Sequence, residues 1–169
     1  MAVQKIVRMA LLSAILTIMK MAIPIPHVEL VSLLIIIYTL LFEKEALMIV
    51  TVFTITEGFI WGIGLWWFGY LYVWPILCLT VLLLKRLIKE EFLVWAVVSG
   101  LFGLIFGALF AVAYLPLDPA YALFYWIAGL TWDVWHAVWN FILMAAIGKP
   151  VYRVLKSINA KVFAYSNDK

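Results

Sequence analysis

The sequence predicts an all-α integral membrane protein in which six transmembrane helices form a single domain over residues 1–169. Hydrophobic residues make up 68% of the chain and charged residues 12%, and the mean hydropathy is +1.15. A soluble domain of this length has too little interior to hide so much apolar surface, so lipid is the expected solvent. The chain also divides into apolar runs close to the ~20 residues that a membrane-spanning helix needs.

Six such runs follow one another, each closed by charged residues or by helix-breaking proline and glycine. The expected spans cover about residues 5–23, 28–42, 46–61, 67–84, 92–115 and 121–148. The stretches that close them are, in the same order, Pro24-Ile-Pro26, Glu43-Lys44-Glu45, Gly62-Ile-Gly64, Lys85-Arg86, Pro116-Leu-Asp-Pro119 and Gly148-Lys-Pro150. The second run is short, so we expect it to be tilted or only partly embedded.

An even number of spans puts both termini on one side of the membrane, and the basic residues indicate which side. Lys20 is the one Lys or Arg that falls on the side opposite the termini. Because Lys and Arg concentrate in cytoplasmic segments, both termini are predicted to be cytoplasmic.

Ionisable residues that topology does not explain gather in the outer half of the expected bundle. They are Lys20, Glu29, Glu57, Asp118 and Asp133, and His27 opens the second span on the same side. Ionisable side chains are costly within lipid and are a mark of functional cavities in membrane proteins. We therefore expect a polar pocket that is open to the outside.

The last span carries its polar residues on one face. Gly129, Asp133, His136 and Asn140 follow one another at spacings of four, three and four residues, and Trp132, Trp135 and Trp139 flank them. The functional interpretation is that Asp133, His136 and Asn140 bind a polar ligand. The alternative is that they join this helix to a neighbour, a role that contributes about 0.6–2 kcal/mol per polar pair.

The third and fourth spans supply further candidates. Glu57 and Trp61 lie one turn apart, and Glu57 is expected either to contact a ligand or to form an ion pair with Lys20. Lys20 has two further options, which are pairing with Glu29 and reaching the outer headgroups. Tyr70 and Trp74 are assigned to the pocket from their direction and depth, although Trp and Tyr also form belts at membrane interfaces.

Other signals limit the possible functions. The single cysteine, Cys78, excludes an internal disulfide and a cysteine-based metal site. Asp133 and His136 lack a second carboxylate–histidine pair, so no metal and no cofactor are expected. Nucleophile elbows, phosphate-binding glycine loops and HExxH motifs are absent from the sequence, which predicts that the chain is not an enzyme and has no ATPase site. Small residues at Gly103 and Gly107 mark a face for close helix packing.

Taken together, the chain resembles the S components of energy-coupling factor (ECF) vitamin transporters over essentially its whole length. The resemblance rests on size, on six spans with cytoplasmic termini and on Ala10-x-x-x-Ala14 in the first span. Its most specific part is the run Trp132-Asp-Val-Trp-His-Ala-Val-Trp-Asn140, followed by Gly148-Lys-Pro-Val-Tyr-Arg153. This run is similar to the last helix of S components for small-ring vitamins or precursors, of the hydroxymethylpyrimidine or pyridoxine kind.

The resemblance implies a substrate-binding subunit of an ABC importer in the bacterial cell membrane. Such a subunit captures a vitamin outside, docks on the membrane subunit EcfT and its two ATPases (EcfA and EcfA′), and releases the vitamin inside by toppling. It implies that Ala10 and Ala14 meet EcfT, and that the segment Pro24-Ile-Pro-His27 acts as a lid. It also implies substrate contacts for Asp133, His136 and Asn140. We add Lys20, His27, Trp132 and Trp139 to the expected substrate-binding residues from their positions in the sequence, not from the resemblance.

Three alternatives stay open. The first is an S component for another vitamin, namely thiamine, pantothenate or folate. The second is a membrane-embedded enzyme that uses Asp133 and His136 as an acid–base pair. The third is a structural membrane protein. The excess of acidic over basic groups in the outer half disfavours a dianionic or phosphorylated ligand. It suits a neutral or weakly basic ring with hydroxyl groups.

Overall fold

The computed structural model describes residues 2–23, 25–26 and 28–167, and regular structure within these ranges is entirely helical. The helices are α1 (Ala2–Met21), α2 (Val31–Phe42), α3 (Glu45–Trp61), α4 (Leu65–Ile88), α5 (Phe92–Ala111), the short 3-10 turn η1 (Val112–Tyr114) and α6 (Pro119–Asn167). The prediction of an all-α chain with six helical segments is therefore confirmed. All helix ends but one lie within about one helical turn of the expected ones, and the exception is the end of α6.

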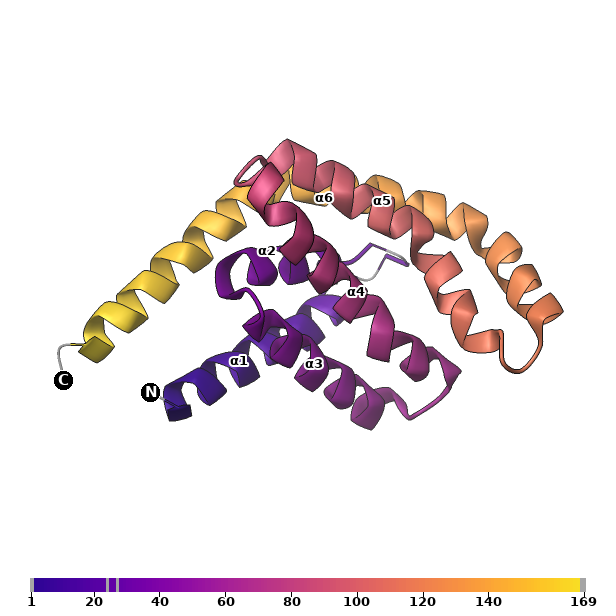
Figure 1. The fold of residues 1–169 in the computed structure, drawn as a ribbon, viewed down its shortest axis with the longest axis horizontal. Coiled ribbons are helices and arrows are strands. Elements are labelled where there is room, and N and C mark those ends of the chain that lie inside the picture. The colour runs from indigo at the N-terminus through magenta and orange to yellow at the C-terminus, as the bar shows by residue number, and fades with distance from the viewer. Residues whose placement is uncertain (1, 24, 27, 168–169) are drawn as a thin grey trace.

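The helices run back and forth along the long axis of the molecule, with both chain ends at the same end of the bundle (Figure 1). The turns at residues 62–64 and 115–118 lie at the opposite end. Ion pairs of Lys5 and Arg8 with Glu45, of Lys85 with Glu43 and of Lys156 with Glu90 join the helix ends on the side of the termini, which is called here the basic end. Lys20 lies in the last turn of α1, which is the end of that helix away from the N-terminus.

Helix α2 forms the centre of the bundle. All nine residues from Val31 to Thr39 are buried, and α2 contacts each of the other five α-helices. A helix that is apolar on every side has to be enclosed on every side. Its burial explains why the second apolar run is both the shortest and among the most hydrophobic.

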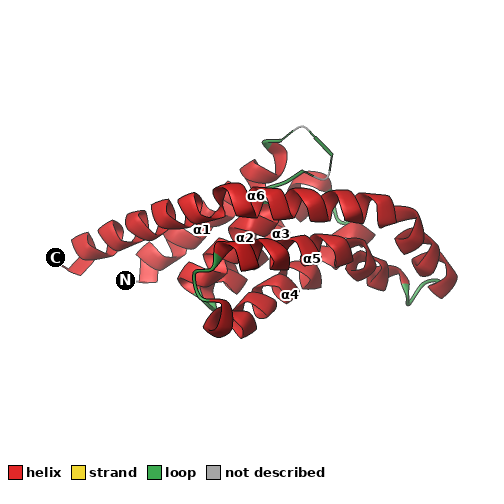
Figure 2. Cartoon of the chain, turned by 90° about the horizontal axis from the view of Figure 1, so that it is seen from above, coloured by secondary structure: helices red, strands yellow, loops and turns green. Residues whose placement is uncertain are grey.

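Helices α5 and α6 form the most extensive pair and lie side by side in both views (Figures 1 and 2). Glycines on α5 allow this approach. A Cβ atom added to Gly103 would lie 2.8 Å from the backbone nitrogen of Ala137, and one added to Gly100 would lie 3.2 Å from the Ala137 carbonyl oxygen. The predicted close-packing face on α5 is therefore confirmed, and α6 is what it packs against.

Apolar side chains cover much of the surface as well as the interior. Large apolar side chains are exposed on α1, α3, α4, α5 and α6, for example Phe59, Leu83 and Leu101. Several polar side chains are buried in the otherwise apolar interior, among them Thr39, Ser99 and Asn140. Two helical segments, Leu65–Ile88 and Phe92–Tyr114, are long and apolar enough to cross a membrane by length and composition.

Ion pairs hold the basic end together across helices. Arg8 of α1 donates to Glu45 at the start of α3 at 2.6 Å, and Lys156 of α6 contacts Glu90 between α4 and α5 at 2.7 Å. The hydrogen bonds from Lys156 and Tyr152 hold the pKa of Glu90 below its ordinary value. These contacts fix the order of the helix ends on this side of the molecule.

The expectation that the last helix ends at Gly148-Lys-Pro150 is wrong. Helix α6 continues through Pro150 to Asn167, and it changes direction in Figure 1 where orange passes into yellow. Proline removes one helical hydrogen bond and bends a helix, but strong helix formers beyond it can carry the helix on. Gly148 serves packing instead, because a Cβ there would lie 2.5 Å from Met144 Sδ and 3.2 Å from the Phe92 ring.

Candidate ligand-binding cavity

A cavity of about 780 Å³ lies at the end of the bundle opposite the basic end. Its wall combines Lys20 of α1, residues of the segment between α1 and α2, and parts of α4, α5 and α6. Small-molecule sites typically measure about 300–1,000 Å³ and are lined mainly by apolar and aromatic groups. Five separate parts of the chain therefore enclose a space of the right size for a small ligand.

Aromatic rings dominate the wall of the cavity. They come from α4, α5 and α6 and comprise Trp66, Tyr70, Trp74, Phe106, Phe110, Tyr121, Phe124, Tyr125 and Trp132. Several are in contact with one another, as between Tyr70 and Trp74, whose ring centroids are 5.3 Å apart. Rings that support each other in this way are held in fixed orientations, and flat faces beside few polar groups suit a flat ligand.

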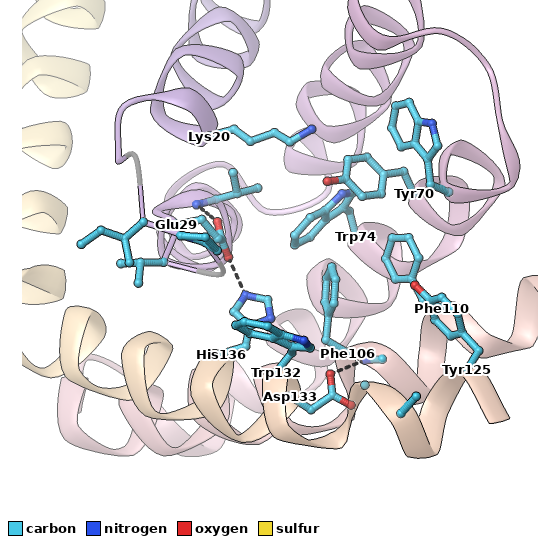
Figure 3. Close-up of a pocket in the computed structure, with 18 of the residues that line it drawn as sticks. Lys20, Glu29, Tyr70, Trp74, Phe106, Phe110, Tyr125, Trp132, Asp133 and His136 are labelled. Atoms are coloured by element: carbon cyan, nitrogen blue, oxygen red, sulfur yellow. Dashed lines mark hydrogen bonds and ion pairs between the residues drawn. The ribbon is translucent and has the colours of Figure 1, made fainter. Parts of the chain in front are cut away.

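Lys20 brings a positive charge to one side of the cavity, where Figure 3 shows its side chain reaching toward Tyr70. Its ammonium group forms an ion pair with Glu57 of α3, whose side chain is fully buried. The same ammonium lies 5.1 Å from the ring centroid of Tyr70, 5.6 Å from that of Trp66 and 5.9 Å from that of Trp61. Of the partners expected for Lys20, the structure selects Glu57.

Glu29 lies in the segment that precedes α2, and its carboxylate points toward His136 (Figure 3). Its carboxylate accepts hydrogen bonds from the backbone nitrogen of Val31, from the Ser32 backbone nitrogen at 3.1 Å and from Ser32 Oγ at 2.7 Å. These donors form the first turn of α2, where the helix dipole favours a negative charge. Glu29 was considered as a partner of Lys20, but its position is explained by the start of α2.

His136 of α6 completes this side of the wall. Its Nε2 atom lies 3.2 Å from Glu29 Oε1, and because a carboxylate only accepts hydrogen bonds, Nε2 carries the hydrogen. The adjacent Trp135 donates from Nε1 to the carbonyl oxygen of Pro26 at 3.2 Å. Two consecutive residues of α6 thus hold the segment between α1 and α2 in place as part of the wall.

Asp133 lies one turn before His136 on α6 and contacts a glycine of α5. Gly107 donates its backbone N–H to Asp133 Oδ1 at 2.8 Å, whereas Oδ2 accepts no hydrogen bond from the described residues. A Cβ on residue 107 would lie 2.5 Å from Oδ2, so only glycine leaves room for the carboxylate. The Gly107–Asp133 contact thereby joins the glycine face of α5 to the polar face of α6.

The predicted site residues fall into two groups. Those that line the cavity are Lys20, Tyr70, Trp74, Trp132, Asp133 and His136. Glu57 and Trp61 lie behind Lys20 and do not line it. Trp139 contacts the Trp135 ring outside the lining, and His27 lies outside the described residues, as does Pro24 of the expected lid.

Asn140 is placed away from the cavity. It is buried and its Nδ2 faces the Ser99 carbonyl oxygen of α5 at 3.5 Å. The cavity extends down the polar face of α6 only as far as His136, and below that point α5 closes against α6 at Gly100 and Gly103. Of the two roles expected for Asn140, joining α6 to a neighbouring helix therefore describes it better than binding a ligand.

Helix α5 and the first turns of α6 also contribute to the wall of the cavity, which was not expected from the sequence. Phe106 and Phe110 of α5 line the cavity, and Tyr121, Tyr125 and Ala128 of α6 do so too. A signal was present, because residues 121, 125, 128 and 132 continue the helical face of Asp133 and His136 toward the start of α6. Their aromatic character pointed equally to an interfacial belt, which hid this role.

The chemistry that the cavity offers is recognition of a flat, polar-edged molecule. The described residues contain no group of three or more metal-ligating side chains. Asp133 is hydrogen-bonded to Gly107, and His136 is hydrogen-bonded to Glu29. These two contacts do not join Asp133 to His136. Comparison of the chain with protein-family models, with curated proteins and with solved structures found no match.

Proposed function

We propose that this chain is a membrane-embedded substrate-binding subunit, the S component of an ECF-type importer. It captures a small heteroaromatic vitamin or precursor, with hydroxymethylpyrimidine and pyridoxine as the first candidates. The observation that carries this proposal is the cavity of about 780 Å³ at one end of an apolar bundle, walled by aromatic rings and four ionisable side chains. An enclosed aromatic wall with few polar groups is the usual form of a site for a small flat ligand.

Insertion of all six helices into a lipid bilayer is part of this proposal. The large apolar side chains exposed on the five α-helices around α2, and the buried polar residues, support it. The gathering of basic residues at the end that holds both termini supports a cytoplasmic position for that end, which turns the cavity outward. A cavity that faces outside is what capture of an external nutrient requires.

Energy for transport would come from partners, because the chain carries no nucleotide-binding motif. EcfT and two ATPases are the proposed partners. Ala10 and Ala14 are both exposed on α1, and small exposed residues one turn apart suit close contact with a helix of another subunit. Different side chains form this surface and the wall of the cavity. Ligand capture and docking on a partner subunit can therefore be tested separately.

The test is a tryptophan-fluorescence titration of the detergent-purified protein with pyridoxine, hydroxymethylpyrimidine, thiamine, pantothenate, folate and biotin. Trp66, Trp74 and Trp132 line the cavity, so a bound ring should quench or shift their emission. Saturable quenching by one compound, recovered unchanged afterwards, is the expected result. Recovery of a chemically altered compound would indicate an enzyme, and a protein that neither responds nor carries a bound small molecule would overturn the proposal.

A further inference from the structure

The charges around the cavity do not balance. Among the described residues, the wall and the ion pair behind it contain three carboxylates, Glu29, Glu57 and Asp133, against Lys20 and His136. Lys20 is already paired with Glu57. Even if His136 is protonated, one negative charge is left over, and two are left over if it is neutral. An uncompensated charge in a poorly hydrated site favours a partner of opposite sign.

Asp133 is where the excess charge is least compensated. Its side chain is 5% exposed, Gly107 supplies one hydrogen bond to Oδ1, and Oδ2 receives none from the described residues. Glu29, by contrast, accepts from two residues at the start of α2 and from His136. The sequence contains no Lys or Arg between Lys89 and Lys149, so neither α5 nor the outer part of α6 provides a cation for Asp133.

Aromatic rings of the wall already lie beside one cation. The Lys20 ammonium, which is paired with Glu57, also lies 5.1–5.9 Å from the ring centroids of Tyr70, Trp66 and Trp61. Cations within about 6 Å of a ring centroid are attracted by the negative face of the ring. Tyr70 and Trp66 belong to the cavity lining, so the same kind of surface continues from Lys20 into the space that a ligand would fill.

From the excess of carboxylates, the aromatic wall and the position of Asp133, we infer that the ligand is an organic cation: a small flat ring that carries a positively charged nitrogen. The inference rests on the proposed function and reorders its candidates, placing a cationic ring such as that of thiamine ahead of hydroxymethylpyrimidine and pyridoxine, which are neutral at pH 7. A cation would balance the charge beside Asp133 and lie against ring faces that favour it. A neutral ring gains only the stacking, and an anionic ring meets an excess of like charge.

The test compares pairs of compounds that differ in charge but hardly in shape. Thiamine, a permanent cation, is paired with its neutral analogue 3-deazathiamine, and pyridoxamine, which carries an ammonium group, is paired with pyridoxine. Fluorescence titration of the wild-type protein should give tighter binding of the cationic member of a pair, by about tenfold or more. This comparison needs no substitution and does not depend on a variant that folds.

Variants then locate the source of the preference. Asp133→Asn should lower the affinity for the cationic member and leave the neutral member nearly unchanged, so that the ratio of the two affinities falls toward one. Glu90→Gln removes a carboxylate that pairs with Lys156 at the basic end and does not line the cavity, so it should leave the ratio as in the wild type.

Two failures are distinguishable. Equal or tighter binding of the neutral members would overturn the cationic class and leave the proposed binding subunit intact. The same conclusion would follow if mass spectrometry of the purified protein found a neutral or anionic molecule bound to it. Absence of binding by these four compounds and by the rest of the vitamin panel, together with absence of any bound molecule, would overturn both the inference and the proposed function.

Discussion

Glu57 does not line the cavity, but it determines the position of Lys20, which does. Glu57 is fully buried on α3, and Lys20 reaches it from the last turn of α1. A buried carboxylate is tolerated when a cation neutralises it, and the loss of that cation leaves an isolated charge in a medium that solvates it poorly. Lys20 is therefore held at the wall by the need of Glu57 for a partner.

At this scale we predict that Lys20→Met lowers the free energy of unfolding by about 3–5 kcal/mol, because it leaves the buried Glu57 carboxyl without its partner. Combining it with Glu57→Leu should restore most of the stability. Thermal unfolding in detergent, followed by circular dichroism, provides the measurement. Lys156→Met is the control, since Lys156 and Glu90 are largely exposed and exposed pairs contribute little. A double variant no more stable than Lys20→Met would contradict the argument.

At the scale of elements, the contact between α5 and α6 decides the geometry of the polar face. Gly103 lies against the backbone of His136 and Ala137, and Gly107 lies against the Asp133 carboxylate. The two glycines are one turn apart, as are the two α6 positions that they contact. The distance between these helices therefore determines where Asp133 and His136 stand relative to the rest of the wall.

We predict that Gly103→Ala destabilises the protein by about 1–3 kcal/mol, because its Cβ would lie within 3 Å of α6 backbone atoms that cannot turn aside. Ligand affinity should fall as well, since α6 moves with its side chains. Gly129→Ala is the matched control for stability: a Cβ there meets nothing within 4 Å, and alanine should stabilise the helix by roughly 0.5–1 kcal/mol. Equal unfolding temperatures for the two variants would refute the predicted role of Gly103.

The helices were predictable because their signal is local. Apolar runs and the charged or proline-containing stretches between them gave the six segments, and the spacing of Gly103 and Gly107 gave a packing face. The extent of α6 was not predictable from Pro150, because the effect of a proline depends on what surrounds the bent helix. For the same reason the sequence placed Asn140 in the cavity: it shares the face of Asp133, but only the fold shows where that face meets α5.

At the scale of the whole molecule, the charges divide the bundle into two ends. The termini, the ion pairs of Arg8 and Lys156 and most basic residues share one end, whereas the cavity and its carboxylates are at the other. In a bilayer this asymmetry would orient the protein, since Lys and Arg stay on the cytoplasmic side. It would also give the outer face a negative potential that attracts cations from solution.

This orientation predicts the outcome of cysteine labelling in intact cells. Leu117→Cys, an exposed position between α5 and α6, should react with a membrane-impermeant maleimide added from outside. Lys161→Cys, near the end of α6, should react only after the cells are permeabilised. The native Cys78 is buried and should stay unlabelled in both experiments. Labelling of both introduced cysteines in sealed cells would contradict the predicted topology.

The contact between Gly107 and Asp133 ties together two positions that are 26 residues apart in the chain. Any side chain at residue 107 would push against the carboxylate, so a substitution there displaces the side chain of residue 133 as well. The two positions are expected to change together in evolution. Where a descendant of this sequence replaces the glycine, a smaller residue should replace the aspartate. An engineer who wants a different ligand has to redesign both together.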